Sequence, residues 1–171
     1  ETQTECRSTT AHLRKVFLEL EHVLNREQRN QTTAVADTLH LIADKIHTRS
    51  LVVIFSDMFE DVENSERLFS ALQHLKHKKH EVLLFHVTEK KTEMDFDFAD
   101  GPYEFIDLET NEKLKLQPAD VRERYTKALN DFYHELLIKC GQYKIDFIEA
   151  DIEKGFDPVM SSFLAKRAKM L

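Results

Sequence analysis

Residues 49–61 read RSLVVIFSDMFED, an apolar run that stops abruptly on Ser56 and Asp57. The stretch from Leu51 to Phe55 shows no alternation of apolar and polar residues, which predicts a strand buried on both faces at the centre of a helix-covered parallel sheet. In open α/β sheets, ligands bind just beyond the carboxyl ends of such strands. We therefore expect the chemistry of this protein at Ser56 and Asp57. The alternative is that Asp57 only caps the helix that follows, since aspartate is a favoured N-cap.

Length and charge narrow the class of protein. The 171 residues match one ordinary domain, so we expect a single domain over residues 1–171. A net charge of −7 argues against nucleic acid as a partner, and no apolar stretch reaches the roughly 18 residues that cross a bilayer. Cys6 and Cys140 lie far apart without metal-type spacing, which is typical of reduced thiols in a cytoplasmic protein.

Hydrophobic periodicity predicts the order of the elements. Helical spacing of apolar residues covers residues 9–24, 33–47, 64–76, 118–140 and 158–169, with Gly141 as the stop signal of the long helix. Strand patterns cover residues 51–55, 81–87 and 143–150, and residues 103–108 and 113–116 form a short hairpin insertion. This order predicts a Rossmann-like, doubly wound, mostly parallel α/β sheet. The expected core comprises Leu51, Val53, Phe55, Leu68, Leu72, Val82, Leu84, Phe132 and Leu136.

Four stretches carry a family resemblance: TAVADTLHLIADKI (residues 33–46), RSLVVIFSD (49–57), KHEVLLFHV (79–87) and YEFIDLET (103–110). In this order they resemble the bacterial family called domain of unknown function 58, over nearly the whole chain. The family is related to von Willebrand factor A domains, which implies a Rossmann-like sheet and, in many such domains, Mg²⁺ at a metal-ion-dependent adhesion site. Family members often accompany MoxR-type AAA+ ATPases, which implies a role in assembling or remodelling protein complexes.

The resemblance also implies that part of the adhesion site is missing. Thr33 matches the threonine of the second metal loop, with Thr32 as its near neighbour and rival, and Asp57 matches the aspartate of the last loop. The Asp-x-Ser-x-Ser loop does not occur, so the chain resembles the C-terminal portion of a von Willebrand factor A-like domain whose first strands are missing. Mg²⁺ requires close to six oxygen ligands. We therefore expect Thr33 and Asp57 to lie together as a partial Mg²⁺ site that binds no metal tightly here, whatever the full-length parent binds.

Histidines offer a competing interpretation. His74, His77 and His80, with His86 beyond them, invite a zinc site. We favour a solvated basic rim instead, because lysines surround this cluster and no cysteine lies near it.

Two classes of function follow. We favour a non-enzymatic protein-interaction module that acts with a protein partner, which the resemblance suggests is a MoxR-type AAA+ ATPase. The alternative is a hydrolase that uses Asp57, for which the sequence offers no nucleophile and base together. In the resembled fold the first strand pairs with the strand at residues 51–55, so that edge would be unpaired here. A second copy of the chain or a repositioned N-terminal segment could cover it, and we expect self-association through the Leu51–Phe55 strand edge.

Overall fold

The structure, a computed structural model of the chain, describes residue 4 and residues 7–25, 35–58, 65–99, 101–106 and 112–168, without the side chains of Ser162 and Lys166. The chain divides into two compact units. The first contains Glu1–Thr32 and Ile106–Glu112, and the second contains Thr33–Phe105 and Lys113–Leu171. The second unit holds the sheet.

The first unit contains the predicted N-terminal helix, α1 (Thr10–Asn25). The hydroxyl of Thr9 accepts a hydrogen bond from the backbone N–H of His12 at 3.2 Å, which satisfies one of the free N–H groups that begin any helix. The apolar spacing predicted this helix correctly, yet Leu13 and Phe17 are both more than half exposed.

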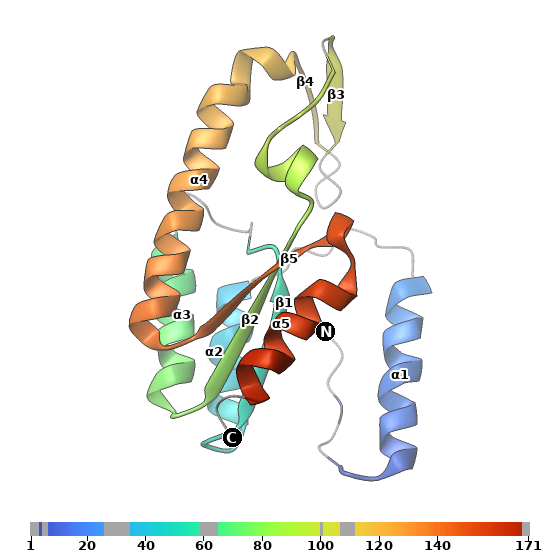
Figure 1. The fold of residues 1–171 in the computed structure, drawn as a ribbon, viewed down its shortest axis with the longest axis vertical. Helices are drawn as coiled ribbons and strands as arrows, with labels where there is room; N and C mark the ends of the chain where they lie inside the picture. The colour runs from blue at the N-terminus through green and yellow to red at the C-terminus, as the bar shows by residue number, and fades with distance from the viewer. Residues whose placement is uncertain are drawn as a thin grey trace. The chain divides into compact units, whose positions relative to one another are not determined.

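A parallel three-stranded sheet forms the centre of the second unit (Figure 1). Its strands are β1 (Leu51–Ser56), β2 (Glu81–Thr88) and β5 (Asp146–Asp151), in the order β1-β2-β5. Ser56 pairs with His86, and His86 pairs with Glu149. The predicted Rossmann-like α/β arrangement is confirmed, and the third strand lies at an edge.

Helices cover the two faces of the sheet unequally (Figure 1). One face of the sheet, the inner face, carries Val52, Ile54, Val82 and Leu84. It packs against three helices: α2 (Val35–Lys45), α3 (Ser65–His77) and α4 (Pro118–Tyr143). The outer face carries α5 (Phe156–Ala168), which follows the short turn η3 (Ile152–Lys154). The α5 helix lies over β2, because the ring of Phe163 meets that of Phe85 at 6.0 Å and Arg167 Nη1 lies 2.6 Å from Glu81 Oε1.

The predicted hairpin is formed by β3 (Tyr103–Ile106) and β4 (Lys113–Leu116), which follow the single π-helical turn η2 (Lys90–Met94). A second, aromatic cluster supports this region. Phe96 is buried and packs on Tyr125 of α4, with ring centroids 4.5 Å apart. Arg122 of α4 donates hydrogen bonds to the carbonyls of Phe96 and Phe98, so the loop before the hairpin is held to α4.

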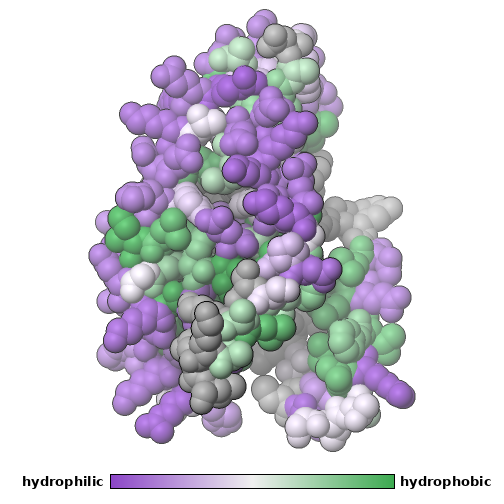
Figure 2. Space-filling model, viewed as in Figure 1, coloured by the Kyte–Doolittle hydropathy of each residue, from purple (hydrophilic) through white to green (hydrophobic). Residues whose placement is uncertain are grey.

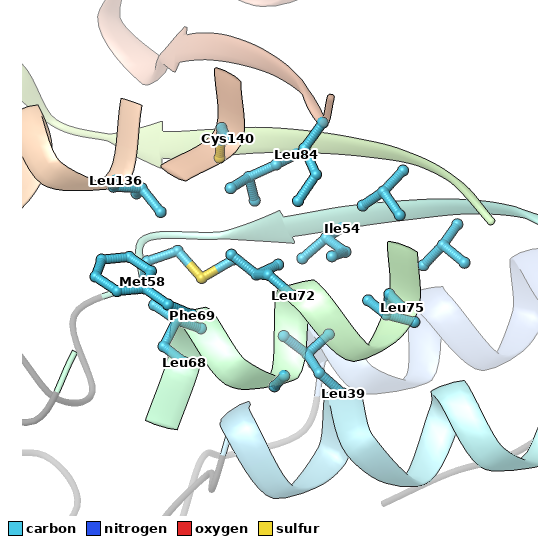
Figure 3. Packing of buried hydrophobic residues seen from close by; sticks show 14 of the residues in the cluster. Leu39, Ile54, Met58, Leu68, Phe69, Leu72, Leu75, Leu84, Leu136 and Cys140 are labelled. Carbon is cyan, nitrogen blue, oxygen red and sulfur yellow. The ribbon is translucent and has the colours of Figure 1, made fainter. Parts of the chain in front are cut away.

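The main core lies between the inner face of the sheet and its three helices (Figure 3). Ile54 of β1 and Leu84 of β2 contribute from the sheet, and Leu72 of α3 from the helices. Six of the expected core residues are buried as predicted: Leu68, Leu72, Val82, Leu84, Phe132 and Leu136.

The prediction that β1 is buried on both faces is wrong. Only Val52 and Ile54 are buried, whereas Leu51, Val53 and Phe55 are 49%, 44% and 65% exposed. The reason is the unequal cover of the sheet. The inner helices cover β1, but α5 covers the outer face at β2, so the outer side chains of β1 remain open.

The prediction that Gly141 ends the long helix is also wrong, since α4 continues through Gly141 to Tyr143. A terminating glycine must adopt a left-handed conformation just past the last turn. Here Lys144 adopts it, with φ of 55°, and its N–H donates to the carbonyls of Cys140 and Gly141.

The core assignment predicts a large cost for Leu84→Ala. The Leu84 side chain is fully buried, so its truncation should destabilise the fold by about 2–5 kcal/mol through lost burial and a residual cavity. Denaturant unfolding measures this cost. Leu51→Ala is the matched control, because Leu51 lies on the open side of the same sheet and should lose much less. Equal losses for the two variants would contradict the one-sided core.

The course of α4 predicts that Gly141→Ala stabilises the protein. A Cβ at this position would meet no atom within 4 Å, and alanine in a helix interior is favoured over glycine by about 0.5–1 kcal/mol. The free energy of unfolding should therefore rise by about that amount. A loss of stability would show that the helix ends at Gly141 in a left-handed conformation, as the sequence pattern suggested.

Candidate functional site

The carboxyl ends of the three parallel strands lie at one edge of the sheet. Register places Ser56 of β1 beside His86 of β2, and His86 beside Glu149 of β5. This is the edge where open α/β sheets bind their ligands.

The chain leaves β1 through a tight turn at Ser56, Asp57 and Met58. The Ser56 hydroxyl accepts the N–H of Met58 at 3.0 Å, and Met58 adopts a left-handed φ of 57°. Its side chain enters the core beside Phe69 (Figure 3). Between these two anchors the Asp57 side chain is exposed at the carboxyl end of β1. The alternative that Asp57 caps the next helix stays a prediction, because residues 59–64 lie outside the described residues and α3 is described from Ser65.

A buried histidine holds this turn from the neighbouring strand. His86 is 4% exposed, and its Nε2 lies 3.0 Å from the carbonyl oxygen of Asp57. A carbonyl can only accept, so Nε2 carries the proton that is donated. Burial lowers the pKa of His86, while the hydrogen bond to Asp57 and the carboxylates of Asp57 and Glu149 act in the opposite direction. His86 is therefore a neutral donor that fixes the backbone of the turn.

A tyrosine and a glutamate continue the cluster away from β1. The Tyr133 hydroxyl of α4 donates to the Glu149 carboxylate of β5, and its ring lies 5.5 Å from that of His86. Phe147 packs against both rings, at 5.6 Å from His86 and 5.8 Å from Tyr133. Burial, followed by the hydrogen bond to Glu149, raises the pKa of Tyr133. The hydroxyl therefore stays protonated at neutral pH and is held as a donor.

Thr33, with its rival Thr32, lies outside the described residues, so its predicted proximity to Asp57 stays a prediction. Among the residues that are described, no group of three or more histidine, cysteine, aspartate or glutamate side chains could hold a metal ion. The Ser56 hydroxyl already accepts the Met58 N–H. The described donors at this edge therefore do not make up the near-octahedral oxygen set that Mg²⁺ requires.

The expected basic rim of histidines is only partly correct. His77 is exposed, but His80 is 1% exposed and its Nδ1 accepts the N–H of Ser50 at 3.2 Å. His74 instead meets His40 of α2, with their Nδ1 atoms 3.0 Å apart, and its Nε2 lies 3.5 Å from Asp44. The histidines thus join neighbouring elements and do not converge on one point.

Sequence reasoning missed Tyr133 and Glu149, and it considered His86 only as an outlying member of the histidine cluster. One signal was available for His86. In the run EVLLFHVT it is the one ionisable residue after Glu81, and it lies shortly before the carboxyl end of that strand. Tyr133 and Glu149 gave no such signal, because their meeting depends on how α4 crosses β5.

The fold and the polar cluster define a parallel α/β protein of the Rossmann-like class, with its candidate site at the carboxyl edge of the sheet. The family model described as protein of unknown function DUF58 matches residues 3–134. The chain belongs to this family. No curated protein and no solved structure matches it. No helix in the described ranges is both long and apolar enough to cross a membrane.

The buried His86 predicts acid sensitivity of the fold. Its pKa in the folded protein lies below the ordinary 6.5, so the unfolded chain binds a proton that the folded protein excludes. The associated stability is fully present above about pH 6.5 and is lost as pH falls through the lowered pKa of the folded state. His86→Gln keeps an amide donor near Asp57 without titrating, so its stability should fall less over the same range. Denaturant unfolding at several pH values measures both.

The matched control is His77→Gln, which removes an exposed histidine. Its pH dependence should follow that of the unmodified chain. Identical pH profiles for all three proteins would contradict the assignment of His86 as a buried neutral donor.

Proposed function

We propose that this chain is a non-enzymatic protein-interaction module of a cytoplasmic bacterial protein, and that its partner is a MoxR-type AAA+ ATPase. One observation carries the proposal: the outer side chains of the edge strand β1, Leu51, Val53 and Phe55, are ordered and open to solvent. Large apolar side chains gathered on one exposed strand are typical of surfaces that bind other proteins.

The surface of the molecule separates apolar regions from polar ones. In the view of Figure 2, hydrophobic surface lies over the C-terminal half of α4 and over α1, whereas the part formed by the hairpin and the N-terminal half of α4 is mainly hydrophilic. The turn after β1 adds a fixed acidic group to the apolar side chains of that strand, since Asp57 follows β1 directly and is exposed. A partner could bury its own apolar side chains against these residues, and the charge of Asp57 would fix the orientation in which it binds.

The polar cluster supports a structural role over a catalytic one. His86 donates to the backbone carbonyl of Asp57, so it does not orient or activate the carboxylate. The Tyr133 hydroxyl is engaged by Glu149, and the Ser56 hydroxyl by Met58. These groups stabilise the carboxyl ends of the strands and thereby fix the surface that carries Phe55 and Asp57. A Mg²⁺ site that includes Thr33 and Asp57 belongs, in this proposal, to the full-length parent.

Direct binding to a purified MoxR-type AAA+ ATPase from the same genome tests the proposal. We expect Phe55→Ser to weaken this binding, because it removes the largest open side chain of β1. Phe156→Ser is the matched control, since Phe156 is also exposed, at the start of α5, and its loss should leave binding unchanged. Equal effects of the two variants, or no binding by the unmodified chain, would refute the proposal. Turnover of an ester or phosphoester that disappears in Asp57→Ala would establish the hydrolase alternative instead.

A further inference from the structure

Five residues in the described part of the chain adopt a left-handed backbone conformation although they are not glycine: Arg49, Met58, Lys79, Phe96 and Lys144. This conformation is unfavourable for a residue with a Cβ atom, and proteins usually place glycine or asparagine there. Met58 and Phe96 are buried, so packing holds them in place. The other three are exposed cations, at φ of 64°, 64° and 55°. Burial therefore does not explain them.

The three cations occupy equivalent positions in the fold. Each lies in a turn that joins a helix to a strand, and each stands two residues before its strand: Arg49 before β1, Lys79 before β2 and Lys144 before β5. Because the three strands are parallel, they all begin at the same edge of the sheet, the amino edge. We call Arg49, Lys79 and Lys144 the cation row.

Hydrogen bonds place the first two turns side by side. Ser50, which follows Arg49, donates its N–H to Nδ1 of His80 at 3.2 Å. The carbonyl of Ser50 accepts the N–H of Glu81 at 3.0 Å. Arg49 and Lys79 therefore lie in neighbouring turns that are tied to each other.

The strand register places the third turn next to them. Leu83 of β2 pairs with Asp146 of β5, and the same register extended toward the start of both strands sets Lys144 beside Glu81. Neighbouring strands lie about 4.8 Å apart, so the row crosses the three strands within roughly 10 Å.

The carboxylates close to the row are engaged by other cations. Glu81 Oε1 lies 2.6 Å from Arg167 Nη1, and Asp44 Oδ1 lies 3.5 Å from both Lys78 Nζ and His74 Nε2. Among the described residues, no ion pair involves a member of the cation row. The row is thus an uncompensated positive surface on a chain whose net charge is −7.

Stabilisation of helix ends accounts for one member of the row at most. A cation near the C-terminus of a helix interacts favourably with the helix dipole. However, α2 and α3 already carry Lys45 and Lys76 in their last turns, so Arg49 and Lys79 are not needed for this purpose. Only α4 has no basic residue in its last turn, and there Lys144 can serve it.

The backbone of these turns does not form a compact anion site. The N–H of Lys79 donates to the carbonyl of Lys76 at 2.9 Å, and the N–H of Lys144 donates to the carbonyls of Cys140 and Gly141. Backbone N–H groups that are engaged in this way cannot cradle a phosphate. Binding at the row therefore depends on its side chains, which are spread over three turns.

We propose that the cation row docks an acidic segment of a partner protein, which lies in extended form across the amino edge of the sheet. Alternate side chains of an extended segment lie on one face, about 6.8 Å apart, so carboxylates at alternate positions can reach the row. A nucleic acid or an anionic membrane would also meet the acidic remainder of the chain, whereas a short segment avoids that repulsion.

This inference goes beyond the ATPase interaction proposed above and does not rest on it. The apolar side chains of β1 and Asp57 define the surface proposed for the ATPase, and Asp57 lies at the carboxyl edge of the sheet. The cation row lies at the amino edge. Binding of an acidic peptide tests the inference alone, so either proposal can fail without the other.

The experiment measures fluorescence anisotropy of a short fluorescein-labelled peptide of alternating glutamate and serine, mixed with the purified chain at low salt. The variant Arg49→Asn/Lys79→Asn/Lys144→Asn should weaken binding by about tenfold or more, because three exposed ion pairs are lost. Asparagine tolerates the left-handed conformation, so the midpoint of thermal unfolding should not fall. Added salt should weaken binding by the unmodified chain.

The matched control is Lys90→Gln/Arg124→Gln/Lys127→Gln. These three residues are also exposed, and the change removes the same number of lysines and arginines, so both variants have the same net charge. The control variant should bind the glutamate peptide as the unmodified chain does. A peptide of alternating glutamine and serine should bind to none of the three proteins.

Four results would overturn the inference. The first is equal binding of the glutamate and glutamine peptides, and the second is an equal loss of binding in the two triple variants. The third is a fall in the thermal midpoint of the asparagine variant without a change in peptide binding, which would make the row a structural feature. The fourth is sedimentation of the chain with phosphatidylserine–phosphatidylcholine vesicles through the row without any binding of the peptide, which would assign the row to a membrane surface.

Discussion

The parallel pairing of β1 with β2 is the constraint on which the rest of the structure depends. The pairing joins Leu51 to Glu81 at one end and Ser56 to His86 at the other. It places Val52 and Ile54 on the side of the inner helices, where they are buried. The same pairing decides which backbone groups of β1 are used and which point away from the sheet. The core and the candidate site are thus two consequences of one register.

The site depends on that register because His86 reaches Asp57 only when the two strands end together. A neutral imidazole at the end of β2 donates to the backbone just after β1, and the Met58 side chain locks the turn from the core side. A polar contact and an apolar contact therefore hold this turn, in which Met58 adopts a left-handed backbone conformation although it is not a glycine. The energetic cost of that conformation, about 1–2 kcal/mol, is offset by the burial of a methionine, which contributes about 1.5–3 kcal/mol.

The sequence predicted the order and type of the elements because these depend on local pattern. The runs LVVIFS and EVLLFHVT are apolar and rich in β-branched residues, and the stripe through Leu68 and Leu72 has helical spacing. Burial was predicted less well, because it depends on which neighbour covers which face. An apolar run without alternation is expected when both faces are covered, yet Leu51, Val53 and Phe55 are exposed on a strand that, within the described part of the second unit, has helices on one side only. The site cluster of His86, Tyr133 and Glu149 could not be predicted for the same reason, since it joins residues from three separate elements.

The misjudged burial of β1 also changes its interpretation. A strand that is apolar on both faces and covered on one carries an energetic liability of exposed hydrophobic side chains. Charges, which usually relieve such a liability, occur only at its two ends, at Arg49 and Asp57. Charges inside the strand would oppose any pairing with another strand. Charges of opposite sign at its two ends act differently. Parallel in-register pairing with an identical strand would place each charge beside a like charge and is opposed, whereas antiparallel pairing would place opposite charges together and is favoured.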